Sequence, residues 1–180
     1  MSIRMATIED IPQILDIYRP YVENTAISSE YTVPSLYEFH QRFLKTTAQY
    51  PWLVWEEKGA ILGYTYASRP LERAAYQWSA SASIYLRPDA KGKGIGRKLY
   101  AALEQLLQLQ GYRKVYAIIT TVNEDSIAFH QAVGYRQAAQ LPDCGYKLGI
   151  RYGILWMEKT LNTWDAPPNA PLPVNQFINL

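Results

Sequence analysis

The stretch RPDAKGKGIGRKLYAALEQLL, residues 87–107, is the part of the sequence that best indicates the fold and the ligand of this chain. Three glycines, Gly92, Gly94 and Gly96, alternate with other residues, and apolar residues at helical spacing follow at once. Glycines allow a backbone in which successive N–H groups converge, and the start of a helix adds unpaired N–H groups and the positive end of its dipole. Together these features predict an anion site, most often one for phosphate, and lysine and arginine side chains surround it.

The two common nucleotide loops do not fit this stretch. A P-loop needs Gly-x-x-x-x-Gly-Lys followed by Ser or Thr, and the sequence contains no such string. A dinucleotide-binding loop needs a third glycine where Arg97 stands. A plain tight turn with a charged rim is the simplest alternative, but three alternating glycines exceed what a turn requires. The stretch therefore favours a phosphorylated ligand of another kind.

The segments around this loop predict an α/β domain. Strand-like runs occupy residues 2–7, 75–86, 114–121 and 153–161, and a hairpin over residues 52–68 turns at Lys58 and Gly59. Apolar residues at helical spacing predict helices over residues 9–24, 34–50, 98–111 and 124–134. The buried run 114–121 after a helix suggests a parallel pairing. Residues 1–161 are therefore expected to form one domain, and the proline-rich residues 162–180 a tail outside its core.

Composition narrows the class of protein. The chain has 180 residues, is 48% hydrophobic and carries a net charge of +2, which suits one globular domain and argues against nucleic-acid binding. Its single cysteine, Cys144, excludes an internal disulfide and suits a reducing compartment. The first residues lack the apolar run of a signal peptide, and the sequence has no run long enough to span a membrane. We expect a cytoplasmic protein that binds no membrane and no metal.

The loop Lys91-Gly92-Lys93-Gly94-Ile95-Gly96 resembles the pyrophosphate loop of the GNAT superfamily of N-acetyltransferases, which binds acetyl-coenzyme A. The segments IYRPYVENTAISSEYTVPS, GYTYAS, AYQWSASASIYL, GYRKVYAIITTVNEDSIAFHQAVGY and WMEK resemble, in this order, the phosphinothricin acetyltransferase branch over residues 2–160. That branch acetylates the amino group of small amino acids and analogues such as phosphinothricin and methionine sulfoximine. The resemblance implies a mixed central sheet of six or seven strands with splayed middle strands and about four flanking helices. It also implies acetyl-coenzyme A as co-substrate and a homodimer.

The resemblance assigns a coenzyme site. The backbone of Ile84, Tyr85 and Leu86 is expected to bond the pantetheine arm. The pyrophosphate is expected to bind the loop residues Lys91, Gly92, Lys93, Gly94, Ile95, Gly96 and Arg97. Asn123 and Ser126 match an Asn-x-x-Ser pair expected to contact the coenzyme, although Asn123 equally suits a simple helix cap.

Three residues are the catalytic candidates. His130 stands where the wider superfamily places a tyrosine acid, and a histidine that titrates near ~6.5 could protonate a departing thiolate. Spacing alone favours a structural histidine, whereas the resemblance favours the catalytic one. Tyr85 could donate its hydroxyl in the pocket. Glu30 matches a glutamate near the acceptor, which could bind the substrate ammonium or remove its proton, and a solvated loop acid is the alternative.

The acceptor site keeps some residues of the branch and departs from it at two places. Arg73 and Tyr76 lie where the branch grips the acceptor carboxylate, and Arg69 competes with Arg73 for that role. Ser81 stands where the branch has its presumed base, a glutamate, and a serine cannot replace a carboxylate base near neutral pH. A second branch acid is absent at residues 151–153.

These losses keep three functions open. The first is direct acetyl transfer to a small amino acid or amine in a ternary complex. The second is a degenerate member that binds acetyl-coenzyme A without turnover, and the third is an acetyltransferase for a protein or another amine. A covalent route through Cys144 is poorly supported, because no histidine or acid lies beside it in sequence.

Overall fold

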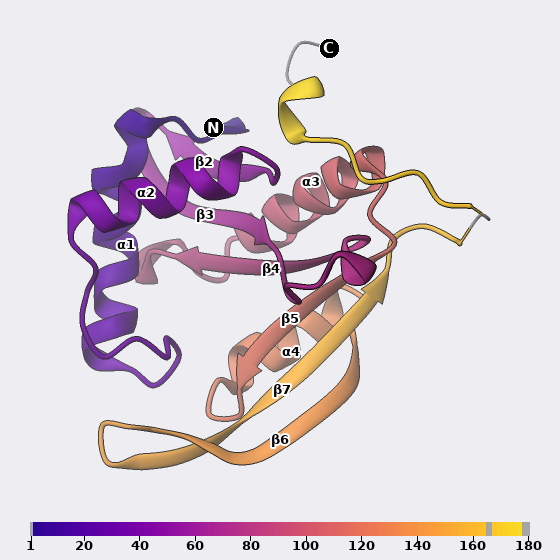
Figure 1. The fold of residues 1–180 in the computed structure, drawn as a ribbon. Helices are drawn as coiled ribbons and strands as arrows, with labels where there is room; N and C mark the ends of the chain where they lie inside the picture. The colour runs from indigo at the N-terminus through magenta and orange to yellow at the C-terminus, as the bar shows by residue number, and fades with distance from the viewer. Residues whose placement is uncertain (1, 165–166, 178–180) are drawn as a thin grey trace.

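The computed structural model describes residues 2–164 and 167–177. Within that part of the chain one sheet has the strand order β1-β2-β3-β4-β5-β7-β6 (Figure 1). The strands are β1 (Ser2–Met5), β2 (Trp52–Glu57), β3 (Ala60–Ser68), β4 (Ser79–Leu86), β5 (Lys114–Thr120), β6 (Arg136–Lys147) and β7 (Ile150–Thr160). The α-helices are α1 (Ile11–Asn24), α2 (Leu36–Thr47), α3 (Ile95–Gln110) and α4 (Glu124–Ala132). Among the strands of the described residues only β4 and β5 pair in parallel, so the predicted mixed sheet with a parallel pairing is confirmed.

Helices cover both faces of the sheet. Successive strand residues point to opposite faces. On one face, Leu53 and Trp55 of β2 pack in the cluster that holds Leu99 and Leu103 of α3. On the other face, Trp52 and Val54 pack in the cluster formed with α1 and α2. The sheet is therefore the middle layer of three, with α3 on one face and α1 and α2 on the other.

The middle strands part soon after they pair. β4 and β5 are joined only where Ser79–Ser81 lie beside residues 114–116. From Ala82 to Leu86, β4 is paired with β3 alone (Figure 1). The splayed middle strands that the resemblance implied are thus present, and one edge of β4 is free along its second half.

Backbone alternation decides which residues of β4 serve that free edge. Arg87 N–H donates to the Leu62 carbonyl across 2.9 Å, so residue 87 directs its polar groups toward β3. Tyr85 lies two residues earlier, opposite Tyr64, and does the same. Ile84 and Leu86 therefore direct N–H and C=O into the gap. The geometry therefore favours Ile84 and Leu86 over Tyr85 for the predicted backbone contact with the pantetheine arm, because the backbone groups of Tyr85 face β3.

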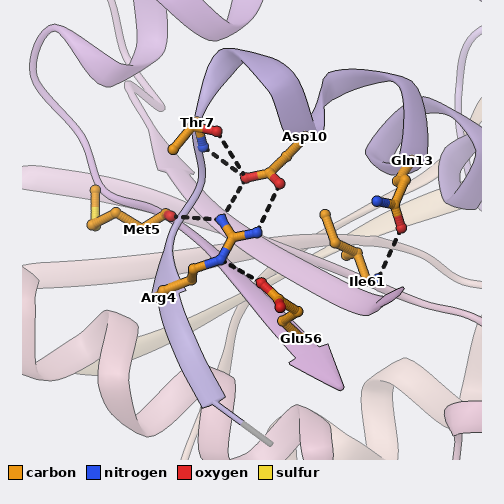
Figure 2. A network of polar contacts seen from close by, with 7 residues as sticks. All are labelled: Arg4, Met5, Thr7, Asp10, Gln13, Glu56 and Ile61. Atoms are coloured by element: carbon orange, nitrogen blue, oxygen red, sulfur yellow. Dashed lines mark hydrogen bonds and ion pairs between the residues drawn. The ribbon is translucent and has the colours of Figure 1, made fainter. Parts of the chain in front are cut away.

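The first strand is fixed to the start of α1 by an ionic network (Figure 2). Arg4 donates to both carboxylate oxygens of Asp10, at 2.6 and 2.8 Å, and to Glu56 at 2.7 Å. Asp10 also accepts from the Thr7 N–H at 2.8 Å. The network joins β1, β2 and the helix that follows, and so sets where α1 lies over the sheet.

Strand β6 is absent from the sequence-based prediction, which placed no strand between residues 134 and 153. The segment contains Pro142 and Gly145, and its pairing with β7 shifts register twice, between residues 137 and 139 and between 141 and 145. It lies at the sheet edge, where proline and bulges are tolerated. Most of its side chains are exposed, so no apolar alternation marks it.

The described part of the tail packs on the domain. Trp78 Nε1 donates to the Asn169 carbonyl at 2.8 Å, and Leu172 N–H donates to the Gln110 carbonyl at 2.9 Å. Val174 is 1% exposed. The sequence predicted a tail outside the core, in which the apolar Phe177, Ile178 and Leu180 favoured docking over disorder. Val174 is instead buried, and Ile178 and Leu180 lie outside the described residues. None of the described helices has the length and apolar character needed to cross a membrane.

Candidate active site

A cavity of about 490 Å³ opens where β4 and β5 part. We call it the gap cavity; it is bounded by the end of β4, the glycine loop, the start of α4 and two residues of the α1 layer, Tyr21 and Ile27. All the coenzyme residues predicted from the resemblance line it except Tyr85 and Lys93. Segments far apart in sequence therefore meet as expected at one cavity.

The glycine loop leads directly into α3. Gly94 is the N-cap of α3 with φ +76°, and Gly92 has φ +74°, values that residues with a Cβ rarely adopt. The N–H groups of residues 95–97 belong to the first turn of α3 and have no partner inside the helix. A Cβ on Gly96 would lie 3.3 Å from the Phe129 ring and 3.4 Å from the Ile84 side chain, so glycine is needed for close packing.

These features fit a pyrophosphate. The first-turn N–H groups and the helix dipole favour an anion, and Lys91 and Arg97 add positive charge at the cavity wall. Lys93 and Lys98 are exposed on the same loop and first turn, although Lys98 Nζ lies 5.4 Å from the Trp55 ring centroid. The observed cradle therefore suits the phosphates of a coenzyme.

Asn123 caps α4 and also lies on the wall of the gap cavity. Its side-chain oxygen accepts from the Ser126 N–H at 3.3 Å, which caps α4. Both residues also line the gap cavity. Phe129 and Asp125 lie beside them at the cavity, and sequence reasoning missed both. Their signal was only their place on the same helix turns as Ser126.

His130 lies behind this wall and does not line the gap cavity. The ring is buried, with Nε2 2.8 Å from the Tyr100 hydroxyl and Nδ1 2.7 Å from the Ser126 carbonyl. Burial lowers the pKa of His130, against the opposing effect of the Ser126 hydrogen bond. Both ring nitrogens have structural partners, so the geometry supports the structural alternative for this histidine and gives its proposed acid role no direct route.

Tyr85 lies inside a cluster of tyrosines between α1 and the sheet. Its ring centroid is 5.0 Å from that of Tyr18, 5.2 Å from Tyr21 and 5.4 Å from Tyr64. Burial raises its pKa well above the usual value, so this phenol holds its proton strongly. Tyr21 donates a 2.6 Å hydrogen bond to the Leu86 carbonyl at the free edge of β4. Through Tyr21 the tyrosine cluster therefore forms part of the wall of the gap cavity beside the end of β4, a role that the sequence did not indicate.

A second cavity, of about 340 Å³, lies on the face covered by α1 and α2. We call it the aromatic cavity, because six aromatic side chains line it: Tyr18, Phe39, Tyr50, Trp52, Tyr64 and Tyr66. Trp52 and Tyr66 stack with ring centroids 4.2 Å apart. Tyr66 lies opposite Ser83 of β4, so the cavity wall is one strand away from the free edge of β4.

Charged groups gather at the rim of the aromatic cavity. The predicted acceptor residue Glu30 is there, together with Arg42, Lys45, Arg69 and Glu72. Glu30 forms an ion pair with Arg42. Arg69, which the sequence left as the competitor of Arg73, lines this cavity. Arg73 and Tyr76 do not line either cavity; both are exposed, at the start of a short 3₁₀ helix and within it.

The remaining candidates lie as follows. Ser81 is 9% exposed and lies opposite Ser68, a residue of the aromatic cavity, so the position of the absent carboxylate faces that side. Cys144 is exposed on β6 and does not line either cavity. In the described part of the chain no group of three His, Cys, Asp or Glu side chains could hold a metal ion.

Comparison with known proteins matches this arrangement. The family model described as "Acetyltransferase (GNAT) domain" matches residues 3–156. The phosphinothricin N-acetyltransferase of Streptomyces viridochromogenes is 30% identical over 177 residues, which cover 98% of this chain and 96% of that protein. The L-methionine sulfoximine/L-methionine sulfone acetyltransferase of Pseudomonas aeruginosa is 34% identical over 172 residues, covering 93% and 98%.

A solved structure gives the same result for the fold. The phosphinothricin acetyltransferase of Sinorhizobium meliloti, in complex with AcCoA, superposes with a TM-score of 0.89 and 35% identity, covering 95% of this chain and 94% of that one. The chain therefore belongs to the GNAT acetyltransferase family, as the sequence predicted, and is an acetyl-coenzyme A-dependent N-acetyltransferase.

Proposed function

We propose that this enzyme acetylates the α-amino group of a small amino acid or amino-acid analogue, with the donor in the gap cavity and the acceptor in the aromatic cavity. The observation that carries the proposal is the position of the aromatic cavity. It lies one strand from the free edge of β4 and brings acidic and basic side chains together at its rim. The relatives that act on phosphinothricin and methionine sulfoximine support the same class of acceptor.

The donor is held by backbone groups and a few cations. Acetyl-coenzyme A supplies a thioester carbonyl that an amine can attack. The loop from Lys91 to Arg97 binds its pyrophosphate, and the backbone of Ile84 and Leu86 bonds the pantetheine arm as an added strand would. Because Tyr21 already donates to the Leu86 carbonyl, Ile84 offers the less encumbered N–H and C=O pair.

The acceptor is recognised by both of its charges. The ammonium group suits Glu30, and the carboxylate suits Arg69, whose planar guanidinium can bond both oxygens. Arg42 is already paired with Glu30 and fixes that carboxylate. The six aromatic rings give the acceptor side chain an apolar surface. An α-amino acid with a mostly apolar or compact polar side chain fits these demands better than a plain amine.

The reaction is a direct transfer. The neutral amine attacks the thioester carbonyl carbon, the new C–N bond forms, the C–S bond breaks, and the sulfur leaves as a thiolate. The amine proton goes to Glu30 or to water, because Ser81 offers no carboxylate. Holding the two reactants in line lowers the barrier by about 7–11 kcal/mol in favourable systems, so positioning can offset the absent base.

The first experiment measures thiol release from acetyl-coenzyme A with matched acceptors. L-Methionine sulfoximine and phosphinothricin are compared with an amine of the same side chain that lacks the carboxylate, and with a short peptide. Turnover confined to the amino acids supports the proposal. Bound coenzyme without any turnover favours the degenerate member, and turnover of the peptide alone favours a protein acetyltransferase.

Two arginine variants locate the carboxylate contact. Arg69→Ala is expected to raise the acceptor KM about tenfold, the loss of one charge-assisted contact, whereas Arg73→Ala changes it little. The reverse order would return the role to Arg73 and place the acceptor outside the aromatic cavity. The acetyl-coenzyme A KM serves as the internal reference for both variants.

We also propose that the enzyme is a cytoplasmic homodimer. Several large apolar side chains are exposed near or within the β6–β7 hairpin, including Leu141, Tyr146, Leu148 and Ile150, and such clusters suit an interface. The mass in solution by light scattering tests the dimer. A monomer at all working concentrations would contradict it.

A further inference from the structure

Lys147 is a buried lysine at the end of β6. The residue is 2% exposed, and its Nζ donates to the Val22 carbonyl at 2.6 Å and to the Ser28 carbonyl at 2.8 Å. Val22 lies in the last turn of α1, where carbonyls have no partner inside the helix and the dipole favours a cation. A buried ammonium is costly unless it is well bonded. Here two buried carbonyls bond it, so Lys147 fixes the last turn of α1 and Ser28 to the end of β6.

The segment that Lys147 holds serves both cavities. Ile27 lines the gap cavity, and Glu30 lines the aromatic cavity three residues later. Ser28 lies between them; its carbonyl accepts from Lys147, and its hydroxyl accepts from the Glu30 N–H at 3.3 Å. Lys147 therefore fixes Ser28, and Ser28 in turn holds the backbone of Glu30.

The same segment has a second tie to the hairpin. The Tyr31 hydroxyl donates to the Tyr146 carbonyl, next to Lys147. Figure 1 shows the β6–β7 hairpin reaching across to the segment between α1 and α2. Tyr18 of α1 adds a third contact, a 2.7 Å hydrogen bond between its hydroxyl and that of Ser28. Residues 25–31, which we call the acceptor segment, are thus held by α1 on one side and by the β6–β7 hairpin on the other.

We propose that Lys147 is a positioning residue for the acceptor, which acts by holding residues 25–30 so that Glu30 stands at the aromatic cavity. The acceptor role of Glu30 rests on the proposed function. Lys147 itself does not line either cavity, so its influence passes through the segment. Without its ammonium group, the carbonyls of Val22 and Ser28 lose a buried donor and the segment loses its tie to the hairpin.

Lys159 offers a matched control. Its Nζ also donates to a backbone carbonyl, that of Val133, at 2.8 Å, and to Glu104 at 2.7 Å. It lies beside α3 and the end of α4, away from the acceptor segment. Both Lys147→Met and Lys159→Met remove a bonded ammonium and keep most of the length of the side chain, so both are expected to lower the melting temperature.

The kinetic experiment separates positioning from plain stability. Lys147→Met is expected to raise the acceptor KM about tenfold while the acetyl-coenzyme A KM changes less than about threefold, and Lys159→Met leaves both near the wild-type values. The effect of Glu30→Gln is expected to be smaller in the Lys147→Met background than in the wild type, because both changes act on one contact. Equal effects of the two lysine variants on the acceptor KM would overturn the proposal.

Hydrogen exchange tests the tie without any acceptor. In the substrate-free protein, amides of residues 25–31 are expected to exchange at least about tenfold faster in Lys147→Met and at the wild-type rate in Lys159→Met. Unchanged exchange in Lys147→Met overturns the proposal even if amino acids are acetylated. Faster exchange in an enzyme that acetylates no amino acid would overturn the proposed function and, with it, the acceptor role of Lys147, while leaving the tie itself in place.

Discussion

The hydroxyl of Tyr100 lies 2.8 Å from Nε2 of His130, and both side chains are buried. The other ring nitrogen, Nδ1, lies 2.7 Å from the Ser126 carbonyl, which can only accept a hydrogen bond. Nδ1 must therefore carry the hydrogen, and Nε2 accepts from Tyr100. This neutral tautomer joins α4 to α3 behind the gap cavity.

A structural His130 predicts a specific pH dependence of stability. Burial lowers the pKa of the folded imidazole, so between that pKa and about 6.5 the unfolded chain binds the extra proton. Stability is then fully present above about pH 6.5 and falls as the pH drops below it. His130→Gln is expected to remove this part of the slope in denaturant unfolding, and to lower kcat less than about tenfold. A loss of kcat above about a hundredfold with stability unchanged would restore the catalytic role.

Asp10 is expected to stabilise the fold at pH values above the range in which its carboxyl group titrates. Burial opposes ionisation, but hydrogen bonds from Arg4 and from the Thr7 N–H outweigh it and lower the pKa of Asp10 (Figure 2). Its contribution is present above the unfolded pKa, about 3.9, and is lost as the pH falls through the folded value. Asp10→Asn should cost about 2 kcal/mol at pH 7, and less below pH 4.

Asp16 provides the control for that measurement. It is an exposed acid on the same helix, so Asp16→Asn should change the free energy of unfolding by less than about 0.5 kcal/mol. Urea unfolding of the two variants and the wild type at several pH values decides the matter. An Asp10→Asn cost that stays constant from pH 7 to pH 3 would show that the ion pair is not its source.

Gly94→Ala should weaken donor binding through the glycine loop. The left-handed conformation at φ +76° costs a residue with a Cβ about 1–2 kcal/mol, so the free loop of the variant is expected to relax out of it. Binding must then restore the strained loop, which corresponds to roughly a tenfold higher KM for acetyl-coenzyme A. The KM for acetyl-pantetheine, which has no pyrophosphate, should not change. Gly59→Ala is the matched control, because Gly59 has φ +81° and equal open space but lies in the β2–β3 turn. A similar KM change in both variants would contradict a phosphate-binding loop.

The sequence was most informative where one local signal implied one local structure. The alternating glycines predicted the loop at the start of α3, and Lys58-Gly59 predicted the turn that joins β2 and β3, where both have positive φ. The spacing of apolar residues also predicted each α-helix of the described residues, with ends that differ from the observed ends by a few residues. By contrast, β6 has no apolar alternation, because it is an exposed edge strand whose register is set by β7.

The acceptor side depended on contacts between distant segments, which no local pattern carries. The sequence assigned the carboxylate contact to Arg73 with Arg69 as the competitor, and only the path of the chain after β3 places Arg69 at the aromatic cavity. Lys147 and Ser28 are 119 residues apart in sequence, so their hydrogen bond leaves no periodic signal. His130 matched a family position, but its burial against Tyr100 depends on the packing of α3 against α4.

The tail is expected to stabilise the domain through one buried side chain. Val174 is 1% exposed, and its N–H donates to the Gln49 carbonyl at 3.1 Å. Val174→Ala should lower the free energy of unfolding by about 1 kcal/mol or more, whereas Leu172→Ala, at a 45% exposed residue beside it, should change it by less than about 0.5 kcal/mol. Denaturant unfolding measures both. Equal, small effects would show that the tail does not dock in solution.

Ser81→Glu tests how the enzyme manages without the branch carboxylate. In the wild type the amine loses its proton without a carboxylate at this position, so kcat/KM is expected to rise with pH until the free amine predominates. A glutamate here faces the aromatic cavity, as Ser68 opposite it does, and burial at a 9% exposed position raises the pKa of its carboxyl toward the working range of a base. The variant should raise kcat/KM at pH 7 about tenfold and flatten the alkaline rise. Ser81→Gln has a side chain of equal size but no base, so it should do neither. Equal pH profiles for the two variants would show that a carboxylate at residue 81 does not assist removal of the amine proton.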